Sequence, residues 1–140
     1  EINEEKKMNL LLGRVSPSLS RRIEMALELV TEVEKDELPK ELYEMVGTGV
    51  DTVEAIPASL AIFKASEGDP IMAVKYAANA GGDTDTIGAI AGAIVGSYAG
   101  IEAFPGSYLD RIEGVNDLGI KKYAEKLVEL IDTELIVNGE

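Results

Sequence analysis

Two aspartates and a threonine, Asp83, Asp85 and Thr86, stand directly after a Gly81-Gly82 pair. Oxygen ligands on one short, bent segment can converge on a single hard cation, and Mg²⁺ prefers near-octahedral oxygen coordination. Two close carboxylates also repel each other unless a cation joins them. The spacing therefore predicts part of a magnesium site. It leaves open a simpler interpretation, in which the aspartates only cap the following helix.

A calcium-binding EF-hand loop starting at Asp83 is excluded by the residue types that follow. Such a loop needs oxygen ligands at its fifth and twelfth positions, which here are Ile87 and Ile94. A short turn with two carboxylates and a hydroxyl suits a cation that keeps several of its waters.

The composition narrows the chemistry further. The chain has no histidine and no cysteine, and its formal net charge is −13. Hydrolases with a histidine base, disulfides and zinc fingers are excluded for this chain. Acid–base chemistry must therefore come from carboxylates, lysine, tyrosine or metal-bound water. The negative field repels phosphate backbones, so no nucleic-acid partner is expected. The lack of cysteine favours a cytoplasmic location.

No signal peptide or membrane association is predicted. Residues Glu1–Lys7 are charged and lack an apolar core. The longest apolar stretch without charge, Thr86 to Ile101, is shorter than the roughly 20 residues of a membrane span and is rich in glycine. We expect a buried helix there.

Caps and helical spacing of apolar residues predict an all-α fold that positions the aspartates. The expected helices run from a Ser16-Pro17 cap to about Lys35-Asp36, from Pro39 to a break at Gly47-Thr48-Gly49, from Asp51 (with Glu54 at capping-box spacing) or from Pro57 to Ser66, from Asp69-Pro70 to Gly81-Gly82, from Ile87 to Gly100, from Ser107 to Ile112, and onwards from an Asn116-Asp117 cap.

Glycines recur at four-residue intervals along the helix expected after the aspartates, at Gly88, Gly92, Gly96 and Gly100. Each costs about 0.5–1 kcal/mol relative to alanine inside a helix. The row therefore predicts that another backbone approaches this helix closely. The tyrosines at helical apolar positions are expected in the core, namely Tyr43, Tyr76, Tyr98 and Tyr123.

The residues from Ala77 to Ala93, with Gly81-Gly82-Asp83-Thr84-Asp85-Thr86 at their centre, resemble the signature of the ADP-ribosylglycohydrolase family. The segment from Asp51 to Leu60 resembles the helix entrance that precedes it in that family. The resemblance covers roughly Thr48 to Pro105.

This resemblance implies a compact all-α orthogonal bundle around the Gly/Ala-rich helix, and magnesium-dependent hydrolysis of an ADP-ribosyl glycosidic bond. It implies a binuclear Mg²⁺ site, with Mn²⁺ as a possible substitute, for which Asp83, Asp85 and Thr86 supply ligands. Gly81, Gly82, Thr84 and Gly49 are expected to line the substrate site. The substrate would be an ADP-ribosylated protein or an ADP-ribose-like small molecule.

The family's second metal-ligand cluster and its acidic catalytic residue, carried in an N-terminal half, are not found in this sequence. We therefore expect residues 1–140 to form a single domain that is the C-terminal portion of a larger one and supplies half of the metal site. The catalytic residue is left unassigned. The missing half would come from an N-terminal segment or a partner chain, including a second copy of this chain in a dimer. The alternative is a non-catalytic relative that is structural or binds ADP-ribose or metal.

Overall fold

The computed structural model describes residues 17–137, with side chains described for residues 17–130, and every regular element in this part is helical. The all-α prediction is confirmed. The elements are α2 (Leu19–Glu32), α3 (Leu38–Glu41), the π-helix η1 (Leu42–Val46), α4 (Thr52–Ser66), α5 (Pro70–Asn79), α6 (Thr84–Ala99), the 3₁₀ turn η2 (Ile101–Ala103), α7 (Gly106–Asn116) and α8 (Ile120–Val137).

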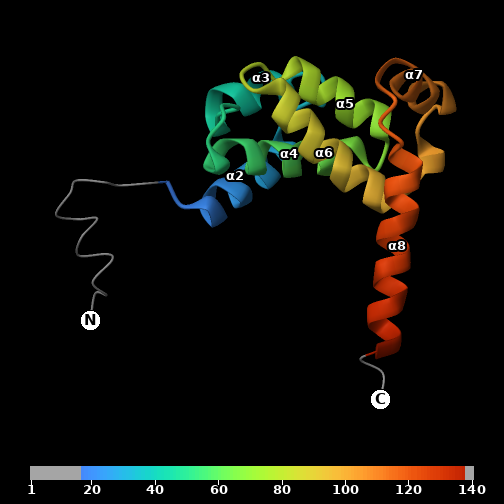
Figure 1. Ribbon diagram of the computed structural model, residues 1–140. Coiled ribbons are helices and arrows are strands. Elements are labelled where there is room, and N and C mark those ends of the chain that lie inside the picture. Colours follow the sequence, from blue (N-terminus) through green and yellow to red (C-terminus); the bar gives the residue numbers. More distant parts are fainter. Residues whose placement is uncertain (1–16, 138–140) are drawn as a thin grey trace. The chain divides into compact units, whose positions relative to one another are not determined.

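The chain divides into two compact units, Glu1–Ala103 and Phe104–Glu140. In the first unit α4 and α6 lie side by side, α2 packs on α4, and α5 packs on both α4 and α6 (Figure 1). The core is made of small side chains, which lets the helices approach closely. The buried hydrophobic residues of α4, α5 and α6, apart from two prolines, are Ala55, Ala58, Ala61, Ile62, Ala65, Ala73, Tyr76, Ala77, Ile87, Ala91 and Val95.

The glycine row on α6 is not where most of this packing occurs. The buried side chains of α6 are Ile87, Ala91 and Val95, a row offset by one residue from the glycines. A Cβ on Gly88 would meet Ala77 at 3.7 Å, whereas no atom of the described residues lies within 4 Å of a Cβ on Gly92. The described residues therefore show only an ordinary side-chain contact at Gly88 and no close backbone approach at Gly88 or Gly92. Gly100 does not belong to the row, because it ends the helix at φ +80°.

A side-chain cap marks the start of α5, whereas α2, α4 and α6 begin without a side-chain capping hydrogen bond. Asp69 accepts hydrogen bonds from the amides of Ile71 (2.8 Å) and Met72 (3.1 Å), as the Asp-Pro signature predicts. α4 begins at Thr52 and continues through the buried Pro57, so the later start at Pro57 is wrong. The predicted Ser16 cap lies outside the described residues, and α2 begins at Leu19 after Ser18.

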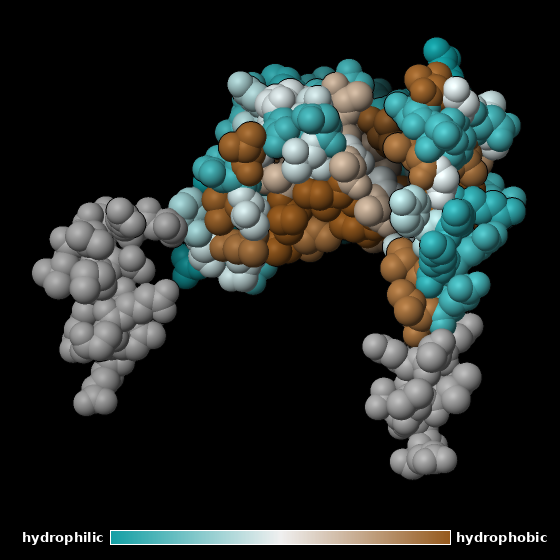
Figure 2. Space-filling model, viewed as in Figure 1, coloured by the Kyte–Doolittle hydropathy of each residue, from teal (hydrophilic) through white to brown (hydrophobic). Residues whose placement is uncertain are grey.

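The second unit contains α7 and α8. Asp117 ends α7 at φ +49° and does not cap α8, which corrects the prediction for Asn116-Asp117. The carboxylate of Glu113 accepts from the amides of Gly119 (2.8 Å) and Ile120 (2.6 Å) at the start of α8. Figure 2 shows hydrophobic side chains along one side of α8 and hydrophilic ones along another, as expected of an amphipathic helix.

Three of the four tyrosines predicted for the core are exposed, namely Tyr43, Tyr98 and Tyr123. Tyr76 is buried, whereas Tyr98 is 72% exposed. The Tyr98 ring packs edge-on against Phe63, with ring centroids 5.7 Å apart. Helical spacing places an aromatic residue on the apolar side of a helix, yet it does not determine whether another element covers that side. None of the helices within residues 17–137 has the length and hydropathy of a membrane-spanning segment.

Candidate metal-binding turn

The turn that carries the aspartates is joined to a second loop by main-chain atoms. The amide of Asp83 donates to the carbonyl oxygen of Thr48 at 2.7 Å. The hydroxyl of Thr48 donates to the carbonyl oxygen of Ala80 at 3.3 Å, and Thr48 is only 2% exposed. Thr48 therefore contacts both ends of the turn, at Ala80 and at Asp83. These contacts hold the turn next to the loop around Gly47–Gly49.

Gly82 is required by this contact. Its φ is +65°, and a Cβ would overlap the Thr48 carbonyl oxygen and lie 2.6 Å from the Thr48 hydroxyl oxygen. Only glycine adopts such a conformation without steric cost and leaves space for the neighbouring main chain. Gly81 has a φ of +70°, and a Cβ there would lie 2.9 Å from the ring of Tyr43.

Asp83 precedes α6 but does not cap it with its side chain. Its carbonyl oxygen accepts from the amide of Ile87 at 3.1 Å, as the first bond of the helix, while its carboxylate makes no capping hydrogen bond. Asp83 therefore occupies the N-cap position without the side-chain hydrogen bond of a helix cap. The carboxylate is half-buried beside the N-terminus of α6, where the helix dipole favours negative charge.

Asp85 and Thr86 are exposed in the first turn of α6, and Thr84 is half-buried between the two aspartates. The pKa of Asp85 is held below its ordinary value, first by hydrogen bonding with the Asp83 carboxyl and then by the backbone amides of Asp85 and Thr86. The two carboxyls thus interact, and a cation between them would offset the repulsion of their charged forms.

A buried side chain of α4 contacts the first turn of α6. The hydroxyl of Ser59, which is fully buried, donates to the carbonyl oxygens of Ala55 (2.7 Å) and Ile87 (3.3 Å). Ile87 is itself fully buried. The first turn of α6 therefore sits on a packed base, and its exposed face carries Asp85 and Thr86.

Gly49, a predicted substrate residue, lies in the neighbouring loop. Its amide donates to Oε2 of Glu54 at 2.8 Å, so this N–H is already occupied. Asp51 and Glu54 were expected to form a capping box, but Asp51 makes no side-chain cap and Glu54 reaches Gly49 instead. The capping-box prediction is wrong.

Sequence reasoning missed Thr48 and Glu54 and misplaced Tyr43. Tyr43 is 58% exposed, and its ring lies against Gly81 rather than in the core. The sequence does contain a signal for this region. It indicates a loop with unusual main-chain geometry at Gly47-Thr48-Gly49, followed by Glu54. It does not say which distant segment that loop meets.

The donor set of the turn is small. Among the described residues there is no group of three or more aspartate, glutamate, histidine or cysteine side chains arranged to hold a metal ion. Asp83, Asp85 and Thr86 bring two carboxylates and a hydroxyl. These hard oxygen donors suit Mg²⁺ or Mn²⁺ but complete only part of an octahedral shell.

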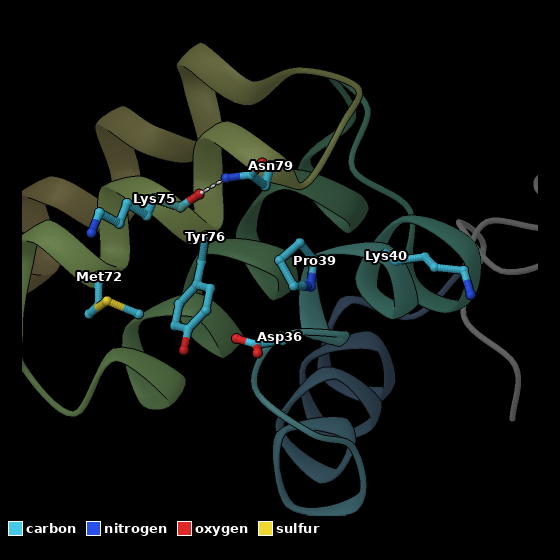
Figure 3. Close-up of a pocket in the computed structure, with 7 residues that line it drawn as sticks. All are labelled: Asp36, Pro39, Lys40, Met72, Lys75, Tyr76 and Asn79. Atoms are coloured by element: carbon cyan, nitrogen blue, oxygen red, sulfur yellow. Dashed lines mark hydrogen bonds between the residues drawn. The ribbon is translucent and has the colours of Figure 1, made fainter.

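A pocket of about 410 Å³ lies away from this turn, between α3 and α5 (Figure 3). The amino groups of Lys40 and Lys75 point away from each other, and the Tyr76 hydroxyl points toward Asp36. Polar groups therefore do not converge on one ligand position there, and we do not assign the pocket to the site. Its lining residues are Asp36, Pro39, Lys40, Met72, Lys75, Tyr76 and Asn79.

Comparison with known proteins agrees with the signature at the turn. Residues 3–135 match the family model for ADP-ribosylglycohydrolase. The uncharacterized protein YegU of Escherichia coli is 38% identical over 115 residues, which are 81% of this chain and 34% of YegU. The ADP-ribosylhydrolase ARH3 is 31% identical over 121 residues in Homo sapiens (78% of this chain, 32% of ARH3) and 32% over 136 residues in Gallus gallus (89% and 35%).

No solved structure gives a significant match. The chain spans about a third of the length of the curated relatives it matches. The match to the family model covers the Gly81–Thr86 turn, both loops that meet there and the helices that carry them. On this evidence, the chain belongs to the ADP-ribosylglycohydrolase family.

Proposed function

We propose that the protein hydrolyses an ADP-ribosyl glycosidic bond in a magnesium-dependent reaction, and that this chain supplies half of the metal site. The observation that carries the proposal is the Asp83 carboxylate, which stands at the N-terminus of α6 without a side-chain capping hydrogen bond, next to the exposed Asp85. Family membership supports ADP-ribosyl groups as the class of substrate.

The donors fit the cation. Asp83, Asp85 and Thr86 would hold Mg²⁺, or Mn²⁺ in its place, through hard oxygens at the exposed end of a rigid helix. A bound Mg²⁺ supplies Lewis-acid stabilisation of charge on oxygen. The role of the chain itself is to position these oxygens, through the bond from Asp83 to Thr48 and through the packed first turn of α6.

Substrate contacts are proposed for the main chain and side chains around the turn. Gly82 is exposed, and Gly81, Thr84 and Gly49 are half-buried, so all four have surface within reach of a ligand bound at the aspartates. The substrate would be an ADP-ribosylated protein or an ADP-ribose-like small molecule. The remaining metal ligands, and the unassigned catalytic acid or base, would come from an N-terminal segment, a partner chain or a second copy.

A second candidate function is binding without catalysis. It is favoured by the small donor set, because the described residues hold no acidic cluster beyond the two aspartates of the turn. A structural relative, or one that binds ADP-ribose or metal, needs no catalytic residue.

Calorimetry with Mg²⁺ and ADP-ribose on the full-length protein, combined with an assay for ADP-ribose release from ADP-ribosylated peptides, separates these functions. Asp85→Ala should weaken Mg²⁺ binding at least about tenfold, in the range typical of losing a metal-site interaction. It should also abolish release. Asp51→Ala is the matched control, because Asp51 also precedes a helix without capping it, and it should behave as wild type.

Equal Mg²⁺ binding by wild type and Asp85→Ala would show that the metal site is assigned wrongly. Tight binding of Mg²⁺ and ADP-ribose without release from any ADP-ribosylated peptide or small molecule would favour the non-catalytic function.

A further inference from the structure

The loop that receives Asp83 is itself held from two sides. On one side, Nη1 of Arg22 in α2 donates a hydrogen bond to the carbonyl oxygen of Val46. On the other, Oε2 of Glu54 in α4 accepts from the amide of Gly49 at 2.8 Å. Thr48, which binds the aspartate turn, lies between these two attachments.

The Glu54 carboxyl group fills space that two glycines leave open. A Cβ on Gly47 would lie 2.6 Å from the carboxyl carbon of Glu54, and a Cβ on Gly49 would lie 2.6 Å from its Oε2. The loop and the side chain are therefore mutually adapted, because neither glycine could carry a side chain while Glu54 keeps this position. The hydrogen bond is also a strong one, since its acceptor is a carboxylate.

A short path of two hydrogen bonds and one stretch of main chain connects this carboxylate to Asp83. Glu54 holds the amide of Gly49, and the adjacent Thr48 carbonyl oxygen holds the amide of Asp83 at 2.7 Å. Glu54 does not act on its own helix N-terminus, because its side chain reaches Gly49 and not the amide of Asp51. Its position is explained by the loop alone.

We propose that Glu54 is a positioning residue, which sets the place of Asp83 through the Gly49 and Thr48 main chain and thereby sets the cation affinity of the turn. The inference rests on the proposed function. It does not make Glu54 a ligand. A group that orients a metal ligand through hydrogen bonds commonly changes metal affinity by about 10–100-fold when it is removed.

The test uses Mn²⁺ as the probe cation, with its affinity measured from paramagnetic relaxation, and amide hydrogen exchange at Gly49 and Asp83 measured by NMR without metal. Glu54→Ala should speed exchange at both amides and weaken Mn²⁺ binding at least about tenfold. Glu54→Gln keeps an acceptor oxygen and should stay within about threefold of wild type. Glu44→Ala removes an exposed carboxylate on η1 and controls for the lost charge.

Unchanged exchange at Asp83 in Glu54→Ala would overturn the connection between the two loops. Faster exchange with wild-type Mn²⁺ affinity would show that Glu54 is structural only. If Glu54→Ala does not fold, Glu54→Asp replaces it, because the shorter side chain cannot reach Gly49 and should give the same losses. If wild type binds no Mn²⁺, the proposed metal site fails and the positioning role with it, whereas exchange at Asp83 still reports the loop contact separately.

Discussion

The glycines at the aspartate turn and the glycines along α6 differ in the space that surrounds them. At the turn, a Cβ on Gly81 or Gly82 would collide with Tyr43 or Thr48, and both residues have positive φ. Along α6, a Cβ on Gly88 would make only an ordinary contact and a Cβ on Gly92 would meet no described atom. Turn glycines are fixed by geometry, whereas these helix glycines are not required by the packing of the described residues.

The sequence drew attention to both sets, to the turn pair by its place before the aspartates and to the helix row by its four-residue interval, but it predicted close backbone approach for the helix row. The four-residue interval suggested that another backbone lies against the α6 glycines. In the structure, the neighbouring row of Ile87, Ala91 and Val95 faces the core. The backbone approach occurs instead at Gly82, where the Thr48 carbonyl lies against the turn. Substitutions at the two sets should therefore have effects of opposite sign.

The largest effect is expected for Gly82→Ala. A left-handed conformation costs alanine about 1–2 kcal/mol, and overlap with Thr48 adds an overpacking cost, so the free energy of unfolding should fall by roughly 2–4 kcal/mol. Denaturant unfolding of wild type and variant measures this difference. A variant as stable as wild type would mean that the Thr48 and Asp83 main chains are not in contact.

Gly81→Ala should be milder, because its neighbour is an exposed tyrosine ring that can rotate away. We expect a loss of about 1–2 kcal/mol from the left-handed conformation, and a smaller loss for Gly81→Asn, since asparagine tolerates that region better. A double-mutant cycle with Tyr43→Ala separates the ring from the backbone. A coupling energy as large as the whole Gly81→Ala loss would contradict this division.

Gly92→Ala should stabilise the protein by about 0.5–1 kcal/mol, the difference in helix propensity between the two residues. Thermal or denaturant unfolding tests this, with Gly88→Ala as a comparison in which the new Cβ gains a contact with Ala77 at 3.7 Å. Destabilisation by Gly92→Ala alone would show that something outside the described residues covers this side of α6, which would restore the original prediction for that glycine.

The smallest effect on stability is expected for the ion pair between Lys35 and Glu67. Glu67 is a non-glycine residue with a φ of +54°. Lys35 contacts it at 2.7 Å, and this hydrogen bond lowers the pKa of Glu67 and raises the pKa of Lys35. The carboxylate's contribution to stability is full above its ordinary pKa of 4.5 and is lost as pH falls through the lowered value. The ammonium's contribution is full below 10.5 and is lost as pH rises through the raised value.

Both side chains of this pair are mostly exposed, so its contribution should be small and salt-dependent. Lys35→Met should therefore lower the unfolding midpoint only slightly, between those two pKa values and at low salt. A Lys35→Met effect that persists at high salt, or below the lowered pKa of Glu67, would show that packing of the lysine stem and not the ion pair is responsible.

The sequence predicted elements whose signals are local. The Asp69-Pro70 cap, the break at Gly47 and the helix after the aspartates depend on residues close in the chain, and these predictions are confirmed. Two other local signals, the Asp51–Glu54 capping box and the Asn116-Asp117 cap, were wrong. The burial of side chains, which depends on neighbouring elements, was also predicted wrongly in places. Tyr98 lies on an apolar side that is not covered, and Glu113 caps α8 in place of Asp117.

The candidate site shows the same division. A family signature marked the aspartate turn, but Thr48 and Glu54 act through main-chain atoms of a loop far from the turn in sequence. Threonine and glutamate side chains give no pattern for such contacts, because the partner atoms are an amide and a carbonyl that every residue has. Only the glycines around them indicated that something was close.

The bond between Thr48 and Asp83 also has a consequence for the order of folding. It closes a stretch of chain that contains all of α4 and α5. Closing a long loop costs conformational entropy before the final contact is gained, so we expect the aspartate turn to form late, after these helices have packed. A cation that binds only the finished turn would then stabilise the whole closed segment by mass action. Its protection would reach amides in α4 and α5 that never touch it.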